Sequence, residues 1–325
     1  MILRTMQHVV LIAIWLLSAN LSAAHIYNVK ELNSEQIKAL DPESTVVILP
    51  GGILEQHGPY LPSFTDGYVN EQLTSDLAAA ITERGERDVL IFPTIPLGTG
   101  GANDIGRKYS FPGTYTVRAT TLRGIFMDLA TELGDQRFMW IFIMHAHGSP
   151  IHNIALDQAG EYFHDTYGGH MVNLFGMVRP DLSEIGKELI TEEQREEDGL
   201  LMIHADMRET SQILHLRPDL IDSAYKQAPA YPVNTRKDLA KIARAENWPG
   251  YFGSPRLATE DFGARYWDEF SSTVVGLALR ILDGLDYSKL PRLEGNPVTE
   301  AALRYQKTIR DKQQAWLVSK AYDTP

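Results

Sequence analysis

Three short stretches of the sequence gather histidines and acids at spacings that suit metal chemistry. The first, LEQHGPYLPSFTD, places Glu55, His57 and Asp66 among prolines and glycines, directly after an apolar run. Residues i and i+2 of an extended segment point the same way, so Glu55 and His57 can reach toward one point. Carboxylates and imidazoles are suitable ligands for Zn²⁺, Mn²⁺ or Fe²⁺. Alone, an E-x-H triplet is a weak signal because it occurs by chance in many proteins.

The other two stretches add further imidazoles and an acid. His145 and His147 end the apolar run FMWIFIM, and HADMRETS contains His204 and Glu209. The i, i+2 rule predicts that His145 and His147 share one face of a strand. The alternative for Glu209 is a solvated side chain. Five other histidines are interpreted as surface residues or as core residues whose hydrogen bonds are satisfied: His8, His25, His164, His170 and His215.

The elements that carry these stretches alternate between two types. Short apolar runs predict strands buried on both faces at 45–50, 89–97, 138–147 and 170–177. Apolar residues at helical spacing predict helices at 68–85, 119–135 and 153–167. This alternation indicates an α/β protein with a parallel sheet covered on both sides. Ligands of such sheets lie beyond the carboxyl ends of the strands, so the stretches after residues 50 and 144 should meet at one rim.

Composition narrows the classes of function. The chain has 325 residues, 44% of them apolar and 22% charged, as in an ordinary globular protein. Its formal net charge is -12 and no block of lysines and arginines stands out, which argues against a nucleic-acid partner. The chain has no cysteine, so thiolate nucleophiles, disulfides and cysteine metal sites are excluded. Metals must be held by histidines and carboxylates.

The first 24 residues have the layout of a secretory signal. Arg4 is followed by the apolar core VVLIAIWLL and then by small residues that end at Ala24. A membrane anchor is the alternative, but the core is shorter than the roughly 20 residues that span a bilayer. We therefore expect cleavage after Ala24, export to the periplasm or the medium, and no stable membrane insertion of the mature chain.

The mature chain, residues 25–325, shows no linker, repeat or low-complexity segment and is predicted to be one domain. Near its end, Asn296 and Pro297 have the types favoured at the start of a helix. The helix that follows is expected to pack on the domain or on a neighbouring subunit through Leu303, Ile309 and Trp316.

Five motifs in order resemble the creatininase (creatinine amidohydrolase) family: EQHGPYLPSFTD, FPGTYTV, HAHG, HADMRETS and GYFGSPRLATEDFG. The resemblance runs from about residue 45 to about residue 285. It implies a three-layer α/β/α sandwich with a mostly parallel sheet, which assembles into an oligomer, often a hexamer. It also implies hydrolysis of C–N bonds in non-peptide or cyclic amides.

The resemblance further implies two divalent metal ions per chain, Zn or Mn, with Fe as a third possibility. The ligands carried over from the family motifs are Glu55, His57, Asp66, His147 and Glu209, with Asp66 as the bridge. His204 then occupies the place of a proton-transferring histidine, and His145 is the second candidate for that role.

Several positions depart from the family pattern and suggest a substrate other than creatinine. Tyr60 replaces a histidine, His145 stands where an asparagine is usual, and Ser149 falls on the expected pocket wall. Arg107 and Lys108 lie near two positions that are Glu and His in the family, and they could recognise an anionic group of the substrate. A solvated loop is the alternative for this basic pair.

Three classes of function follow. The first is a metal-dependent amidohydrolase that acts on a small cyclic or linear amide. The second is a metallopeptidase-like enzyme that trims a peptide, and the third is a non-catalytic relative that binds a small molecule. A deep, closed pocket favours the first class over the second, and an open groove favours the second.

Overall fold

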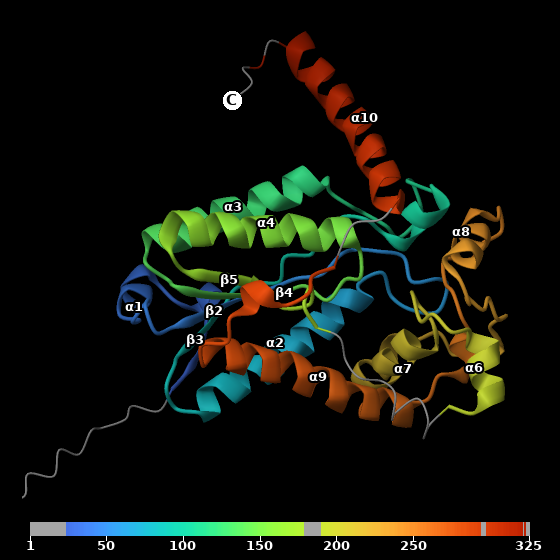
Figure 1. Cartoon of the computed structure of the whole chain (residues 1–325), viewed down its shortest axis with the longest axis horizontal. Helices are drawn as coiled ribbons and strands as arrows, with labels where there is room; N and C mark the ends of the chain where they lie inside the picture. Colours follow the sequence, from blue (N-terminus) through green and yellow to red (C-terminus); the bar gives the residue numbers. More distant parts are fainter. Residues whose placement is uncertain (1–23, 179–189, 294–296, 321, 323–325) are drawn as a thin grey trace, which may run out of the picture.

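A parallel β-sheet forms the centre of the molecule. The computed structural model describes residues 24–178, 190–293, 297–320 and 322. The sheet has five strands in the order β1-β3-β2-β4-β5, and neighbouring strands are parallel (Figure 1). The strands are β1 (Ile26–Asn28), β2 (Val46–Pro50), β3 (Val89–Ile91), β4 (Trp140–Met144) and β5 (His170–Asn173). The expected parallel sheet is confirmed, with β1 as an edge strand that the sequence patterns did not predict.

Helices cover both faces of this sheet. On one face lie α3 (Ala119–Asp135) and α4 (Pro150–Tyr167), and on the other lie α2 (Thr65–Glu83) and α9 (Glu260–Leu282) (Figure 1). The expected three-layer α/β/α sandwich is therefore confirmed. The predicted helix 119–135 coincides with α3. α4 begins three residues earlier than predicted, at a proline, which suits the first position of a helix because it has no N–H to satisfy.

Strand β2 is apolar throughout because both of its faces are covered. Val46 and Ile48 point into the core that includes α2 and α9, whereas Val47 and Leu49 point into the core that includes α3 and α4. All four side chains are fully buried. The alternation follows from the twofold period of an extended chain, and it fixes which face each residue after the strand can reach.

Three predicted strands are shorter in the structure, and one of them, β5, ends at Asn173 and not at residue 177. β3 ends at Ile91, not at residue 97, because Pro93 and Pro96 have no N–H to donate to a neighbouring strand. β4 ends at Met144, so His145 and His147 lie in the loop that follows it. The i, i+2 rule for strands consequently does not apply to these two histidines.

Shorter helices complete the molecule. α7 (Met207–Leu216) packs against α9 and α2, and α8 (Arg236–Arg244) packs on the 3-10 helix η2 (Ala102–Gly106). Neither was predicted from the sequence, nor were α1 (Ser34–Lys38) and α6 (Glu192–Asp198). The other 3-10 helices are Val29–Glu31, Pro218–Leu220, Ser223–Gln227, Pro255–Leu257 and Tyr287–Lys289.

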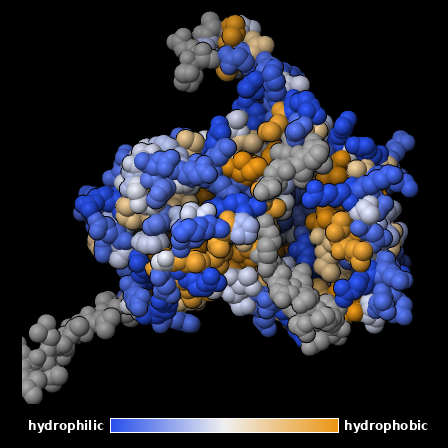
Figure 2. Space-filling view, in the orientation of Figure 1, coloured by the Kyte–Doolittle hydropathy of each residue, from blue (hydrophilic) through white to orange (hydrophobic). Residues whose placement is uncertain are grey.

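The predicted C-terminal helix is present as α10 (Pro297–Ser319), which projects from the body of the molecule (Figure 1). Its surface is mostly polar (Figure 2). Of its predicted contact residues, Leu303 and Trp316 are 46% and 54% exposed, and Ile309 lines a cavity at the base of the helix. Asn296, expected at the helix start, lies outside the described residues.

The predicted signal segment also lies outside the described residues, except for Ala24. In the part of the chain that the structure describes, no helix combines the length and the apolar character needed to cross a bilayer.

The packing of α4 on the sheet can be tested with one pair of glycines. A Cβ at Gly160 in α4 would lie 2.3 Å from the carbonyl oxygen of Met171 in β5, whereas a Cβ at Gly124 in α3 would meet no atom within 4 Å. We expect Gly160→Ala to lower the free energy of unfolding by about 1–3 kcal/mol through overpacking. Gly124→Ala should raise it by about 0.5–1 kcal/mol, because alanine is the better helix former. Urea unfolding of both variants measures the difference, and equal effects would contradict this packing.

Candidate metal centre

Six ionisable side chains form two trios at the carboxyl ends of β2 and β4. In each trio, one possible ligand atom from each residue lies within 4.8 Å of the others. The first trio is Glu55, Asp66 and His147, and the second is His57, His204 and Glu209. Five of the six residues are buried, and Glu209 is half-buried. The structure therefore brings together every residue that was predicted as a metal ligand, and His204 with them.

Asp66 belongs to the first trio and also faces His57 of the second. Its Oδ2 is 2.9 Å from His147 Nδ1, and its Oδ1 is 3.3 Å from His57 Nε2. The residue is in the first turn of α2, where the helix dipole favours a negative charge. Burial opposes ionisation, but the hydrogen bond with His147 and the charges of His147 and His57 outweigh it and hold the pKa of this carboxyl well below its usual range. One carboxylate can thus serve both trios, as the predicted bridge requires.

Main-chain carbonyls orient the two imidazoles on either side of Asp66. The Nδ1 of His57 lies 2.9 Å from the carbonyl oxygen of Glu55, which leaves Nε2 facing Asp66. The Nε2 of His147 lies 3.2 Å from the carbonyl oxygen of Gly100, which leaves Nδ1 facing Asp66. Such contacts fix the tautomer and the direction of a metal-binding histidine.

The second trio depends on the loop before α7. His204 Nε2 lies 2.6 Å from the carbonyl oxygen of Gln56, so this nitrogen is the donor and Nδ1 is free to accept. His204 Nδ1 is 3.9 Å from Glu209 Oε2, and its ring lies 4.3 Å from that of His57. Burial lowers the pKa of His204 to about 4, so the imidazole is neutral at neutral pH.

Glu209 is held by its own helix start. Its Oε2 accepts a hydrogen bond of 2.5 Å from the N–H of Ala205, and its Oε1 lies 3.0 Å from Arg208 Nη2. Asp206 caps α7 by accepting from the N–H of Glu209. Ala205 has a φ of 48°, a left-handed conformation that is costly for a residue with a Cβ. The strained residue is the one whose N–H donates the hydrogen bond to Glu209.

The polar atoms of the centre fit divalent cations. Glu55 Oε2 and His57 Nε2 are buried, and neither has a hydrogen-bond partner among the described residues. Burial disfavours the charged imidazole, yet Asp66 and the other carboxylates raise the pKa of His57 to about 10. Burial is likewise outweighed at His147, where Glu55 and Asp66 raise the pKa to about 9. Such a concentration of acids calls for positive charge, which divalent cations held by these oxygen and nitrogen atoms would supply.

His145, the second candidate for proton transfer, belongs to neither trio. It lies behind Gly51, where an added Cβ would fall 1.8 Å from its Nε2. Its ring packs edge-on against Phe126 of α3 at 5.1 Å, and neither ring nitrogen has a hydrogen-bond partner among the described residues. Burial lowers the pKa of His145 to about 3. The chain turns after β4, so His145 points to the α3 side while His147 points to Asp66.

The four predicted substrate residues lie in different surroundings. Tyr60 is half-buried beside Tyr251, with ring centroids 5.7 Å apart. Ser149 is the N-cap residue directly before α4, and its Oγ lies 2.1 Å from where a Cβ of Gly100 would be. Arg107 is exposed, whereas Lys108 donates to the carbonyl oxygen of Ala245 and lies over the Trp248 ring. Lys108 therefore fastens the loop to its neighbours, and the substrate roles of all four stay predictions.

Some supporting residues were not found from the sequence. Asn70 donates to the carbonyl oxygen of Asp66 and accepts from the N–H of Ala146, which ties α2 to the loop after β4. Asn70 shares a face of α2 with Leu73 and Leu77. A polar residue on an otherwise apolar helix face could have indicated its role from the sequence. Asp198 lies behind α7 and accepts from the N–H of Ser254, and burial raises its pKa to about 7. Its place in the acidic run EEQREED gave no signal.

Comparison with known proteins identifies relatives of this chain. The family model for creatininase, described as creatinine amidohydrolase, matches residues 30–278. A mycofactocin precursor peptide peptidase of Mycolicibacterium smegmatis is 26% identical over 255 residues, which cover 76% of this chain and 87% of the relative. A creatinine amidohydrolase of Pseudomonas putida is 27% identical over 232 residues, which cover 67% of this chain and 82% of the relative.

Solved structures share the fold. A crystal structure of creatinine amidohydrolase superimposes with a TM-score of 0.59 at 21% identity, covering 80% of this chain and 98% of the solved one. A structure described as creatininase Mn has a TM-score of 0.58 at 21% identity, with the same coverage. A mutant creatininase of Zn-Zn type has a TM-score of 0.59 at 21% identity, again with the same coverage.

The place of Asp66 between the trios predicts its effect on metal content. We expect Asp66→Asn to lower the metal bound per chain at both trios, because an amide cannot offer two anionic oxygens. Asp128→Asn, at an exposed position of α3, is the matched control and should leave the metal content unchanged. Plasma mass spectrometry of the purified variants measures the metals. Full metal content in Asp66→Asn would contradict the bridging position.

The raised pKa values of His57 and His147 predict how pH acts on the metal-free protein. A histidine whose pKa is raised above its unfolded value, about 6.5, stabilises the fold fully below that pH, and the contribution is lost as the pH rises through the folded pKa. With folded values of about 10 and about 9, the free energy of unfolding should fall by a few kcal/mol between pH 7 and pH 10. Urea unfolding after chelator treatment measures this slope. The metal-saturated protein is the control and should lack it, and a flat profile without metal would contradict the predicted protonation.

Proposed function

The chain belongs to the creatininase family, and on that premise we propose that it is a hydrolase that uses two divalent metal ions to cleave a C–N bond in a small cyclic or linear amide. The observation that supports this most directly is the position of Asp66. One buried carboxylate faces an imidazole of each trio, at 2.9 Å and 3.3 Å.

One metal ion would lie at each trio, with Asp66 of the first trio as a ligand of both ions and His204 of the second trio as a ligand of neither. Glu55, His147 and Asp66 would bind the first ion, and His57, Glu209 and Asp66 the second. Zn²⁺ and Mn²⁺ suit this mixture of carboxylates and imidazoles, and Fe²⁺ is compatible with it. Relatives of the same fold described as Mn and Zn-Zn forms support the first two.

When bound, such a metal pair supplies a nucleophilic hydroxide at neutral pH and polarises the amide oxygen. His204 would move the protons. Because its Nε2–H is held by the carbonyl oxygen of Gln56, its Nδ1 is the atom that can take a proton from the attacking water. The same atom can then give the proton to the leaving nitrogen. The lowered pKa keeps this imidazole neutral at neutral pH, so Nδ1 carries no proton before the reaction.

Burial of the centre supports a small substrate. Glu55, His57 and His204 are 0%, 1% and 5% exposed, so a bulky chain would have to displace the residues that cover them. Peptide trimming is the second candidate function, and the likeness to a mycofactocin precursor peptide peptidase favours it. A non-catalytic relative is the least favoured, because buried acids are costly to keep without a use.

The remaining parts of the proposal rest on the sequence. Export with cleavage after Ala24 rests on the signal-like segment. Assembly into a homo-oligomer, with a hexamer as the expected form, rests on the resemblance to the family.

The proposed function is tested by metal content and hydrolysis together. The full mature chain, loaded with Zn²⁺ or Mn²⁺, would be assayed with lactams, creatinine-like rings, linear amides and short peptides, each with and without chelator. We expect close to two metals per chain and chelator-sensitive cleavage of a small amide. Cleavage of peptides alone would establish the second candidate. No metal uptake would contradict both hydrolase functions.

A substitution of His204 distinguishes a role in proton transfer from a role in metal binding. We expect His204→Ala to keep close to two metals per chain and to lose roughly 10²–10⁴-fold in kcat, the usual contribution of a positioned acid or base. His25→Ala, at a side chain with 55% exposure, is the matched control and should change neither quantity. Loss of one metal per chain in His204→Ala would instead make His204 a ligand.

A further inference from the structure

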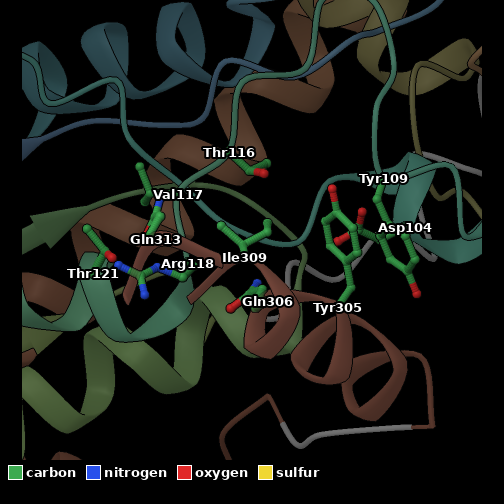
Figure 3. Close-up of a pocket in the computed structure, with 10 residues that line it drawn as sticks. All are labelled: Asp104, Tyr109, Thr116, Val117, Arg118, Thr121, Tyr305, Gln306, Ile309 and Gln313. Carbon is green, nitrogen blue, oxygen red and sulfur yellow. The ribbon is translucent and has the colours of Figure 1, made fainter. Parts of the chain in front are cut away.

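A cavity lies at the base of α10, apart from the two metal trios. Its volume is about 230 Å³, and none of the residues that line it belongs to either trio. Its walls come from η2, from the segment that leads into α3, and from one face of α10 (Figure 3). The cavity therefore differs from the proposed active site in every residue that forms it.

Two contacts hold the base of α10 in place and give the cavity fixed walls. Tyr305 of α10 stacks on Tyr109, with ring centroids 4.1 Å apart and an angle of 8° between the planes. Gln306 accepts a hydrogen bond of 2.8 Å from the N–H of Ala119 at the start of α3, and donates one of 2.8 Å to Thr99 Oγ1. The Gln306 side chain thus binds both the start of α3 and the loop that reaches the metal trios.

One end of the cavity carries an acid without a cation. Asp104 is half-buried, and the one side-chain hydrogen bond that its carboxylate accepts among the described residues, from Asn103 Nδ2, is long at 3.4 Å. No lysine, arginine or histidine in the described part of the chain lies within ion-pair distance of its carboxylate. Burial, with the nearby charge of Glu55, raises the pKa of Asp104 to about 7. A carboxylate in this position gains from any cation that enters the cavity.

The other end carries a cation without an acid. Among the described residues, no side chain forms an ion pair or a hydrogen bond with the Arg118 guanidinium. In Figure 3 this group lies beside Thr121, at the end of the cavity away from Asp104, Tyr109 and Tyr305. Ile309 lies between the two ends. Asp104 and Arg118 therefore line one cavity, and the two side chains form no ion pair with each other.

We propose that this cavity binds a small zwitterion, with its cationic group at Asp104 and its carboxylate at Arg118. The planar guanidinium of arginine pairs with a carboxylate through two parallel hydrogen bonds. The two stacked tyrosine rings beside Asp104 can attract a cation through the faces that the stacking leaves open. Ile309 can contact the methylene groups between the two charges. The volume is below the roughly 300 Å³ and more of drug-sized sites, so the ligand has the size of an amino acid.

This site is separate from the proposed hydrolase activity, and part of it lies outside the residues that match the family model. The family match ends at residue 278, whereas α10 begins at Pro297. Tyr305 and Ile309, which supply one wall, therefore come from a segment outside the match. The binding test below does not depend on turnover, so its failure can be told apart from failure of the hydrolase proposal.

The test is isothermal titration of the full mature chain with four probes. Two are zwitterions, 5-aminopentanoate and 6-aminohexanoate, and two carry one charge each, pentanoate and pentylamine. We expect at least one zwitterion to bind about tenfold or more tightly than both single-charge probes, since each charged contact adds to the affinity. Binding should persist in chelator-treated protein, because no residue of the cavity belongs to the metal trios.

Three variants locate the site. Arg118→Gln and Asp104→Asn should each weaken binding of the zwitterion by about tenfold or more, because each removes one charged partner. Lys307→Gln removes a charge from a 64% exposed position on the same helix and is the matched control, with no expected change. Thermal unfolding of each variant checks that the fold is kept.

Four results would overturn the proposal. The first is that neither zwitterion binds the folded wild-type chain. The second is that a single-charge probe binds as tightly as the zwitterions, and the third is that both variants keep wild-type affinity. The fourth is that binding disappears when the metals are removed, which would place the carboxylate of the probe at the metal trios.

Discussion

Buried carboxylates need positive charge beside them, and the arrangement of this protein around the rim of its sheet follows from that need. Burial of an ionised acid costs several kcal/mol unless partners offset it. Glu55 is buried in the loop after β2 and Asp66 in the first turn of α2, and His57 and His147 each face one oxygen of Asp66. Without metal, protons on the imidazoles supply the charge, and under the proposed function divalent cations take their place.

The orientation of the centre depends on main-chain groups more than on other side chains. One nitrogen of each imidazole in the trios lies at a main-chain carbonyl: His57 at Glu55, His147 at Gly100 and His204 at Gln56. Carbonyls of loops can do this only if the loops keep their shape. That shape depends on close approaches, such as that of Gly51 to the His145 ring and that of Gly250 to the Gln56 side chain, where no Cβ would fit.

One loop connects the metal trios with the part of the chain that lies beyond the family match. The N–H of Ala102 donates to Glu55, and the carbonyl of Gly100 faces His147. On the same loop, Thr99 accepts from Gln306 of α10, and Asp104 lines the cavity under that helix. A helix outside the family match thus contacts the loop that forms one wall of the metal centre.

The sequence by itself determined the layers and the chemistry. Apolar runs such as TVVILP predicted strands covered on both faces, and the segment 119–135 had the spacing and the terminal glycine of a helix, as the structure confirms. Parallel strands place their carboxyl ends at one rim, so Glu55 and His147 had to approach each other. The residue types alone indicated a metal.

Tertiary structure decided how those residues divide and which of them stand together. That Asp66 faces one imidazole of each trio depends on where α2 begins relative to two loops, and no local pattern encodes such a distance. His145 and His147 point to different sides because β4 ends at Met144, three residues before the end that the sequence predicted. Asp104 and Arg118 had no signal at all, because their shared cavity exists only where a helix from the far end of the chain covers them.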